Sequence, residues 1–220
     1  MKNRTTYGII GIGRFGASLA QELLKNDADI MVIDKDPDKI KEFREYTDNA
    51  FIVSSLDTKS LLETGIQNVD VAVVCIGEQL DVSILAAMSL VNMGIPKVIA
   101  KASSEEHGTI LKKIGAEIVY PERDMAIRLA NSLQSSKVID FIQLNQKINI
   151  IKYAINGKFY GLSIRELDIR RKFGLNIIAI ENTGEVIENV FPEYVFKEND
   201  ILFMTGTSEN IAKLNKWAAQ

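Results

Sequence analysis

The sequence predicts an α/β protein, with a doubly wound parallel sheet of six strands in residues 1–135 and a smaller α+β domain in residues 136–220. Three observations support this prediction. A glycine-rich turn stands between an apolar run and a helical pattern near the start of the chain. Short apolar runs without polar alternation then recur between helical patterns, as strands buried on both faces do. After Ser135 the pattern changes to strands joined by short turns.

The glycine turn, Gly11-Ile12-Gly13-Arg14-Phe15-Gly16, predicts a phosphate-binding site of the Rossmann-like kind. Gly11 permits a tight turn, Gly13 lets backbone amides approach a pyrophosphate, and Gly16 lets the helix pack closely on its strand. The helix N-terminus offers partial positive charge to the phosphates. Asp34 ends the second apolar run, about 20 residues later, where a carboxylate accepts hydrogen bonds from ribose hydroxyls. The alternative for Asp34 is a plain turn aspartate.

The elements of the first domain follow from the apolar runs and from the helical patterns between them. The predicted strands are Tyr7 to Ile10, Ile30 to Ile33, Ala50 to Val53, Val69 to Ile76, Lys97 to Lys101 and Glu117 to Val119. The predicted helices lie near Arg14 to Asn26, Pro37 to Arg44, Thr58 to Thr64, Asp81 to Met93, His107 to Ile114 and Glu122 to Leu133. Asp36-Pro37 predicts an N-cap followed by proline at the first helical position.

The second domain has the turn signals and apolar runs of an antiparallel α+β module. Its predicted elements are the strand Ile148 to Ile155, the turn Asn156-Gly157, the strand Leu175 to Glu181, the turn Thr183-Gly184, the strand Ile201 to Gly206 and a helix from Ser208 to Trp217. The polar stretch Gln134 to Lys137 is the predicted link between the domains.

Composition excludes several classes of function. The net charge of −3, without a basic cluster, argues against nucleic acid as a partner. No apolar run approaches the roughly 18 residues of a membrane span, and the polar start Met1 to Thr6 is no signal peptide. The single cysteine, Cys75, lies in an apolar run and is expected to be buried in a protein of the reducing cytoplasm.

Two cations are candidates for binding phosphates. Arg14 lies in the first helical turn, where a cation meets the positive end of the helix dipole and a bound phosphate would reverse the unfavourable sign. Lys101 closes the fifth strand at the same sheet edge and is long enough to reach a terminal phosphate. The alternative for each is a solvated side chain at the surface.

Ser54, Ser55 and Asp57 follow the third strand, where the adenine or its ribose would lie. An N-cap of the next helix explains Asp57 equally well. Glu122 follows Tyr120-Pro121, where a carboxylate complements a helix N-terminus. In a functional role Glu122 would face Arg14 or a metal ion near the phosphates.

Groups suited to catalysis are few. His107 is the only histidine and stands in a polar helix start, which predicts an exposed surface residue. No Tyr-xxx-Lys pair occurs, and Cys75 has no basic neighbour in sequence, whereas hydride transfer usually needs a positioned acid or base. The first domain is therefore predicted to be a nucleotide sensor and not an enzyme.

These motifs together resemble the RCK (regulator of conductance of potassium) proteins, and most of all the cytosolic gating subunits of bacterial Ktr potassium uptake systems. The likeness rests on Gly-Arg-Phe-Gly at 13–16 with Asp34, Ala100-Lys101-Ala102, and Tyr120-Pro121-Glu122-Arg123-Asp124-Met125. Ser54 to Asp57 lacks the Gly-Asp of many relatives, so the adenine contact is less secure than the phosphate contacts.

The resemblance implies that the first domain binds ATP or ADP, with NAD(H) as a further possibility. Arg14 would bridge phosphates, Asp34 would hold the ribose, and Glu122 would help to hold a divalent cation or Na⁺ beside the nucleotide. The residues expected at the nucleotide are Gly11, Gly13, Arg14, Phe15, Gly16, Asp34, Lys35, Ser54, Ser55, Asp57, Lys101 and Glu122. The resemblance also implies homodimers, assembled into an octameric ring under a membrane potassium-translocating subunit on the inner face of the cell membrane.

The second domain resembles the family module that binds cyclic di-AMP at a dimer interface in many Gram-positive members. The residues expected at that ligand are Ile164, Asp168, Ile169, Arg170, Asn176, Ile177 and Pro192. Apolar walls suit adenines, and an arginine with an amide suits phosphates. The alternative is an ordinary amphipathic helix and a core strand.

Two other functions fit the same sequence. One is an NAD(P)-dependent oxidoreductase, because a fold by itself does not determine a function. The other is a cyclic-dinucleotide receptor without a channel partner.

Overall fold

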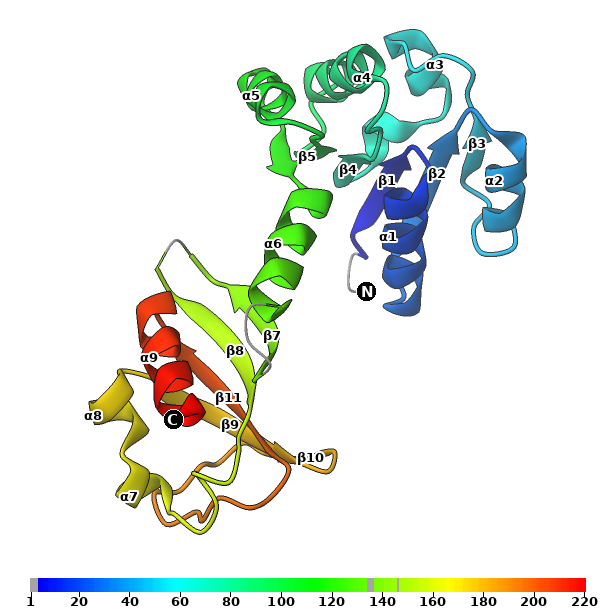
Figure 1. The fold of residues 1–220 in the computed structure, drawn as a ribbon. Helices are drawn as coiled ribbons and strands as arrows, with labels where there is room; N and C mark the ends of the chain where they lie inside the picture. Colours follow the sequence, from blue (N-terminus) through cyan, green and yellow to red (C-terminus); the bar gives the residue numbers. More distant parts are fainter. Residues whose placement is uncertain (1–3, 134–136, 146) are drawn as a thin grey trace. The chain divides into compact units, whose positions relative to one another are not determined.

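A computed structural model describes residues 4–133, 137–145 and 147–220, which form two compact units, Met1–Glu122 and Arg123–Gln220 (Figure 1). The division predicted after residue 135 differs from this one by the helix α6 (Pro121–Leu133), most of which groups with the second unit. An ion pair between Arg128 and Asp140 ties α6 to the strand that follows it. Residues 134–136 of the predicted link lie outside the described residues.

The first unit contains the predicted six-stranded parallel sheet, in the order β3-β2-β1-β4-β5-β6. Its strands are β1 (Thr6–Ile10), β2 (Asp29–Asp34), β3 (Ala50–Ile52), β4 (Val71–Val74), β5 (Lys97–Lys101) and β6 (Glu117–Val119). In this order β1 lies between β2 and β4, so the connection from β1 to β2 and the connection from β4 to β5 lie on opposite sides of β1, as in dinucleotide-binding sheets. The predicted fold class is confirmed.

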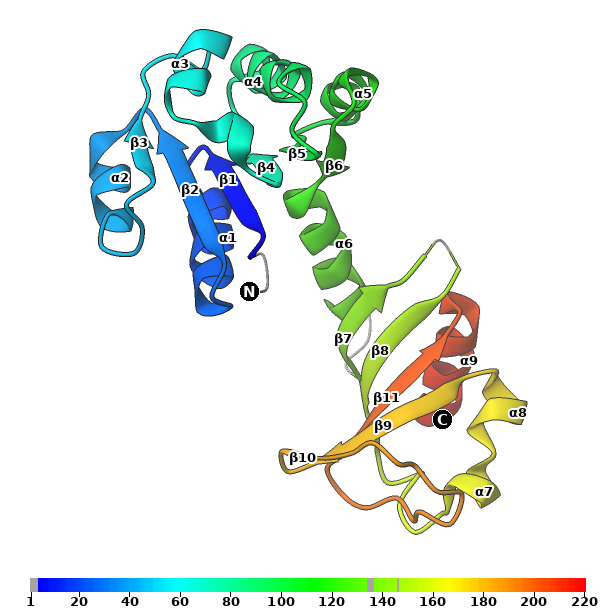
Figure 2. The same cartoon turned by 180° about the vertical axis from the view of Figure 1, so that it is seen from behind.

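Helices cover both faces of this sheet (Figures 1 and 2). The helices are α1 (Arg14–Lys25), α2 (Pro37–Phe43), α3 (Thr58–Glu63), α4 (Leu80–Asn92) and α5 (Glu105–Ile114), with a short 3₁₀ turn at Ile66–Asn68. Neighbouring strand residues enter different cores: Ile9 packs in the cluster that contains α1 and α2, and Ile10 packs in the cluster that contains α3, α4 and α5. Both faces are apolar for this reason, and the strand sequences show no polar alternation.

Local sequence explains where several helices begin and end. Asp36 caps α2 by accepting a hydrogen bond from the amide of Asp38, with Pro37 at the first helical position as predicted. Ser104 caps α5, and Gly115 ends that helix in the left-handed region at φ 110°.

The prediction of an exposed His107 was wrong. Its side chain is buried, at 2% exposed, because it lies one helical turn before the buried Leu111 on the inner face of α5. The polar neighbours Glu105 and Glu106 face solvent and had masked this pattern. The predicted burial of Cys75 is confirmed.

The second unit is a five-stranded antiparallel sheet, in the order β10-β9-β11-β8-β7, with short helices and a long closing helix. Its strands are β7 (Val138–Gln143), β8 (Asn149–Ala154), β9 (Asn176–Asn182), β10 (Glu185–Ile187) and β11 (Asp200–Gly206). Its helices are α7 (Ile164–Leu167), α8 (Ile169–Phe173) and α9 (Ser208–Ala219). The predicted turn Thr183-Gly184 joins β9 to β10, with both residues at positive φ.

Buried residues alternate along the central strands of this sheet. Ile151 and Tyr153 of β8 pack in the core with Leu202 and Met204 of β11, and the residues between them are half-buried on the other face. β7, β10, α7 and α8 were not among the predicted elements, and the predicted elements lie within a residue or two of their predicted bounds.

Candidate functional site

The predicted nucleotide residues of the first unit all lie at one edge of the sheet, because parallel strands bring their carboxyl ends together. β1 and β4 are neighbours there, and their connections run to opposite sides, which opens a crevice between them. The predicted positions are the turn Gly11–Gly16 after β1, Asp34 and Lys35 at the end of β2, Ser54 to Asp57 after β3, Lys101 at the end of β5 and Glu122 after β6.

The three glycines of the turn differ in what the surrounding structure requires of them. Gly11 has φ +93°, a left-handed conformation that costs any other residue strain. A Cβ on Gly16 would lie 2.1 Å from the carbonyl oxygen of Gly11, so only glycine allows this close packing of α1 on the turn. A Cβ on Gly13 would meet nothing within 4 Å. The fold therefore requires Gly11 and Gly16, whereas Gly13 leaves open space in front of the helix.

The N-terminus of α1 has the features of an anion-binding helix end. Gly13 is its N-cap, so no side chain caps the helix, and its first turn contains no acidic residue. Arg14 is exposed there, and among the described residues its guanidinium has no ion-pair partner within 4 Å. Free backbone amides and an unpaired cation together favour a phosphate at this position.

Asp34 holds the glycine turn in place. Its carboxylate is 8% exposed and accepts hydrogen bonds from the amide of Ile12, at 2.6 Å, and from the amide of Asp36, at 2.9 Å. Lys39 lies 3.7 Å away. These contacts realise the turn-aspartate alternative, and each carboxylate oxygen keeps a lone pair that a ribose hydroxyl can use. Sequence reasoning had identified neither the Ile12 amide nor Lys39 as a partner of Asp34.

Lys101 and Glu122 form an ion pair at the same edge. The Lys101 side chain is 13% exposed and that of Glu122 is 69% exposed. The Lys101 ammonium also lies 5.9 Å from the centre of the Phe15 ring in the first turn of α1. The hydrogen bond that Lys101 donates to Glu122, together with the charges of Lys101 and Arg14, lowers the pKa of Glu122 below its ordinary value. The two predicted phosphate ligands and the predicted cation ligand are thus electrostatic neighbours.

The remaining residues predicted at the nucleotide follow β2 and β3. Lys35 is exposed, and its ammonium lies 3.5 Å from the side-chain oxygen of Gln79, in the loop after β4. Asp57 caps α3, and its carboxylate accepts hydrogen bonds from the amide and hydroxyl of Ser60. The Ser60 amide is the main reason that the pKa of Asp57 lies below its ordinary value. The N-cap alternative for Asp57 is therefore realised.

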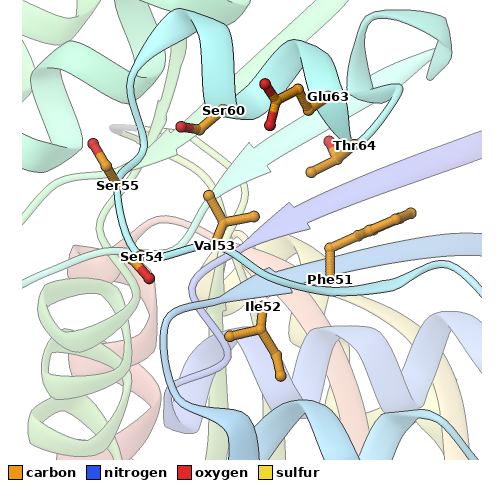
Figure 3. A pocket seen from close by; sticks show the side chains of 8 residues that line it. All are labelled: Phe51, Ile52, Val53, Ser54, Ser55, Ser60, Glu63 and Thr64. Atoms are coloured by element: carbon orange, nitrogen blue, oxygen red, sulfur yellow. The ribbon is translucent and has the colours of Figure 1, made fainter.

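Ser54 and Ser55 line an open cavity of about 420 Å³ between β3 and α3. Figure 3 shows its walls: Ser60, Glu63 and Thr64 come from the helix side, and the chain from Phe51 to Ser55 forms the opposite side. Hydroxyl and carboxylate groups dominate this lining. The cavity adjoins the predicted adenine position but does not include Asp34 or the glycine turn.

Within residues 4–133, 137–145 and 147–220, no three His, Cys, Asp or Glu side chains are grouped so that they could hold a metal ion. None of the helices described for this chain has the length and apolar character that a membrane crossing requires.

In the second unit, two segments far apart in sequence bring predicted ligand residues together. Ser163 and Glu166 form a capping box that begins α7. The amide of Ile164 donates to the carbonyl of Tyr194, and the amide of Arg165 donates to the carbonyl of Pro192. Ile164 and Pro192 therefore lie on adjoining segments.

The other predicted residues of this unit differ in exposure. Arg170 and Asn176 are exposed, and Ile177 is half-buried against the core. Ile169 is 2% exposed and belongs to the core, which corresponds to the ordinary-helix alternative for that residue. Asp168 adopts φ +45° between α7 and α8, and its carboxylate pairs with Arg171 at 2.9 Å.

A buried carboxylate that sequence reasoning missed fixes the segment of Pro192. Asp200 is 1% exposed and accepts hydrogen bonds from the Tyr194 hydroxyl at 3.0 Å, the Asn182 amide group at 2.6 Å and the Lys197 amide at 2.9 Å. Burial and the neighbouring Asp200 raise the pKa of Tyr194 to about 12. Because its charge has several donors, Asp200 ties this segment to β9 and β11.

The helix α6 has no buried residue, and four of its large apolar side chains are exposed. These are Met125, Ile127, Leu129 and Leu133. An apolar helix surface of this kind is typical of an interaction site.

Comparisons with known proteins match the two parts of the chain to two domain families. Residues 7–121 match the TrkA-N domain family, and residues 150–219 match the TrkA-C domain family. Ktr system potassium uptake protein C of Bacillus subtilis (strain 168) is 36% identical over 211 residues, which make up 96% of either chain. Ktr system potassium uptake protein A of the same organism is 31% identical over 214 residues, or 97% of this chain and 96% of that protein.

Among solved structures, the crystal structure of the GsuK RCK domain is similar, with a TM-score of 0.66 at 20% sequence identity. The match covers 100% of this chain and 48% of that one. At this identity the similarity supports the fold alone.

Proposed function

Because this chain belongs to the TrkA-N/TrkA-C family of RCK proteins, we propose that it is a regulatory subunit of a Ktr-type potassium uptake system. The observation that carries this proposal is the similarity to two Ktr proteins across both domains and almost their whole length. The same similarity favours a regulatory protein over the oxidoreductase alternative. The partner would be a membrane potassium-translocating subunit, which would hold this chain at the cytoplasmic face of the membrane.

We propose that the first unit binds ATP or ADP, with NAD(H) as the alternative ligand. The support is the uncapped N-terminus of α1, the open space at Gly13 and the cations Arg14 and Lys101. In this assignment the helix amides and Arg14 bind the phosphates, and Asp34 accepts from the ribose. Glu122 would contribute to a cation site whose other ligands are phosphate oxygens.

Calorimetry with ATP, ADP and NADH on the full chain tests this assignment. Arg14→Ala should weaken binding of ATP and ADP at least tenfold, the effect of losing about 1.4 kcal/mol of charge-assisted hydrogen bonding. Arg44→Ala is the matched control, because Arg44 is also exposed but lies at the C-terminal end of α2. Equal ATP affinity in the wild type, Arg14→Ala and Arg44→Ala would show that the Arg14 side chain lies in solvent and does not contact the nucleotide. Much tighter binding of NADH than of ATP, together with oxidation of NADH by a small substrate, would support the oxidoreductase alternative instead of a nucleotide sensor.

We also propose that the second unit binds cyclic di-AMP across a two-fold axis between two copies of the chain. Ile164 and Pro192 would supply apolar walls with Ile177, while Arg170 and Asn176 would contact phosphates. Ile169 would support this surface from the core. A symmetric ligand meets each side chain twice, so one substitution removes two contacts.

Arg170→Ala should therefore weaken cyclic di-AMP binding by about two orders of magnitude, since each charged hydrogen bond contributes about 1.5 to 3 kcal/mol. Lys213→Ala removes an exposed cation from α9 and serves as the control. No binding of cyclic di-AMP by the folded wild-type chain would remove this ligand from the proposal and leave the first unit's nucleotide in place.

We further propose that copies of the chain pair through α6 and assemble into an octameric ring. The support is the exposed apolar surface of that helix. Native mass spectrometry of the full chain measures the assembly directly. Leu129→Glu, which places a charge on this surface, should reduce the mass of the assembly. A wild-type protein that is monomeric at micromolar concentration would contradict the ring.

A further inference from the structure

We propose that Lys101 exchanges its anionic partner when a nucleotide binds: Glu122 is an internal competitor of the phosphates, and the exchange frees its carboxylate to hold a cation. This inference rests on the proposed nucleotide site of the first unit and adds a regulatory role for the Lys101–Glu122 pair. It makes the effect of Glu122 on nucleotide affinity change sign with the presence of a cation.

The position of the Lys101 ammonium carries the first step. Lys101 ends β5, yet its side chain lies against three other elements at the carboxyl edge of the sheet. The ammonium is 5.9 Å from the centre of the Phe15 ring in α1 and pairs with Glu122 in α6. It would also lie 3.3 Å from a Cβ placed on Gly77, in the loop after β4. The ammonium therefore lies beside the crevice between β1 and β4, where such sheets bind ligands.

The difference in exposure between the two partners carries the second step. At 13% exposed, the Lys101 side chain is largely removed from water and needs an anion near it. At 69% exposed, Glu122 gives up little burial when its carboxylate moves into solvent. The ammonium is the fixed member of the pair, and the carboxylate is the member that can leave.

Charge repulsion carries the third step. A carboxylate within a few ångströms of a di- or triphosphate repels it, unless a cation lies between them. Lys101 and Arg14 together surround the exposed Glu122 carboxylate with positive charge. Without a cation, Glu122 opposes the nucleotide by occupying Lys101 and by repelling the phosphates. With a cation, the same carboxylate becomes one of its ligands.

The experiment measures the affinity of the full chain for ADP by calorimetry, first in a Tris buffer with EDTA and then with Mg²⁺. Glu122→Gln keeps the shape of the side chain and removes its charge. The matched control is Glu117→Gln. Glu117 in β6 forms an ion pair with Lys97 in β5, at 2.9 Å, at the amino ends of these strands, away from the proposed nucleotide site.

In EDTA we expect Glu122→Gln to bind ADP about tenfold more tightly than the wild type, a ratio equivalent to about 1.4 kcal/mol. With Mg²⁺ the wild type should gain affinity, and Glu122→Gln should not. Lys101→Met should weaken ADP binding in both buffers, and Glu117→Gln should match the wild type throughout. Thermal unfolding checks that each variant is folded.

Equal or weaker binding of ADP by Glu122→Gln in EDTA would overturn the inference, because Glu122 would then not compete with the phosphates. In that case, ADP binding by the wild type would still support the proposed nucleotide site. A folded wild-type chain that binds no ADP in either buffer would overturn both.

Discussion

Gly13 and Gly16 stand three residues apart in one turn, yet alanine should destabilise the protein at Gly16 and leave its stability almost unchanged at Gly13. At Gly16 a Cβ would lie 2.1 Å from the Gly11 carbonyl oxygen and 3.2 Å from the Cβ of Cys75. At Gly13 a Cβ would meet no atom within 4 Å, and the backbone angles of φ −81° and ψ −170° suit any residue. Gly16→Ala therefore tests the packing of the turn, and Gly13→Ala tests only the space in front of it.

The geometry sets the expected magnitudes. To reach an ordinary contact of 3.4 Å at Gly16, α1 and the turn must separate by about 1 Å, and such overpacking costs about 1 to 3 kcal/mol or more. Alanine recovers up to about 1 kcal/mol of helix propensity. Because the clash at Gly16 is with a backbone atom, which cannot rotate away, the cost should lie at or above the upper end of this range, and the net loss should be about 2 kcal/mol. At Gly13, the weaker N-cap preference of alanine and the reduced entropy of the unfolded chain nearly cancel, leaving a change within about 0.5 kcal/mol.

Urea denaturation followed by far-UV circular dichroism measures both variants. The fluorescence of Trp217, the single tryptophan, reports the second unit separately. If the proposed nucleotide site is correct, Gly13→Ala should also lose ADP affinity while keeping its stability, because its methyl group occupies the space where phosphate approaches the amides. A Gly16→Ala protein as stable as the wild type, or a Gly13→Ala protein destabilised by 2 kcal/mol, would refute the reasoning.

Three further predictions follow from buried groups. Asp34→Asn should lower the affinity for ATP and ADP alike in calorimetry, because the ribose is common to both, and a loss confined to ATP would contradict the ribose contact. Burial lowers the pKa of His107, so the unfolded chain takes up a proton more readily than the folded chain. The free energy of unfolding should therefore fall as the pH drops below the ordinary histidine value of about 6.5, and should fall less in His107→Gln; equal slopes in urea denaturation between pH 7.5 and 5.5 would exclude this role. Asp200→Asn turns a donor group toward buried donors and should cost about 1 to 3 kcal/mol, against about 1 kcal/mol for Tyr194→Phe, and Trp217 fluorescence in urea would reveal a reversed order.

Elements with strong local signals were predictable. The glycine turn, the N-cap and proline at the start of α2 and the unalternated apolar strands depend on residues close in sequence, and the structure has all of them. β7 escaped prediction because its register shifts between Val138 and Asp140, and this irregularity interrupts the two-residue period that identifies a strand. α7 and α8, with 4 and 5 residues, are too short to show a helical period.

The partners of the polar side chains were decided by the tertiary structure alone. Lys101 and Glu122 are 21 residues apart, and Asp34 and the Ile12 amide are 22 apart. In each case sequence identified the residue and its sheet edge, but not what its charge contacts. The order of the strands decides which ends become neighbours, and the packing of α5 decides that His107 points inward. Periodicity determines the face on which a side chain lies, whereas the neighbour on that face comes from a distant part of the chain.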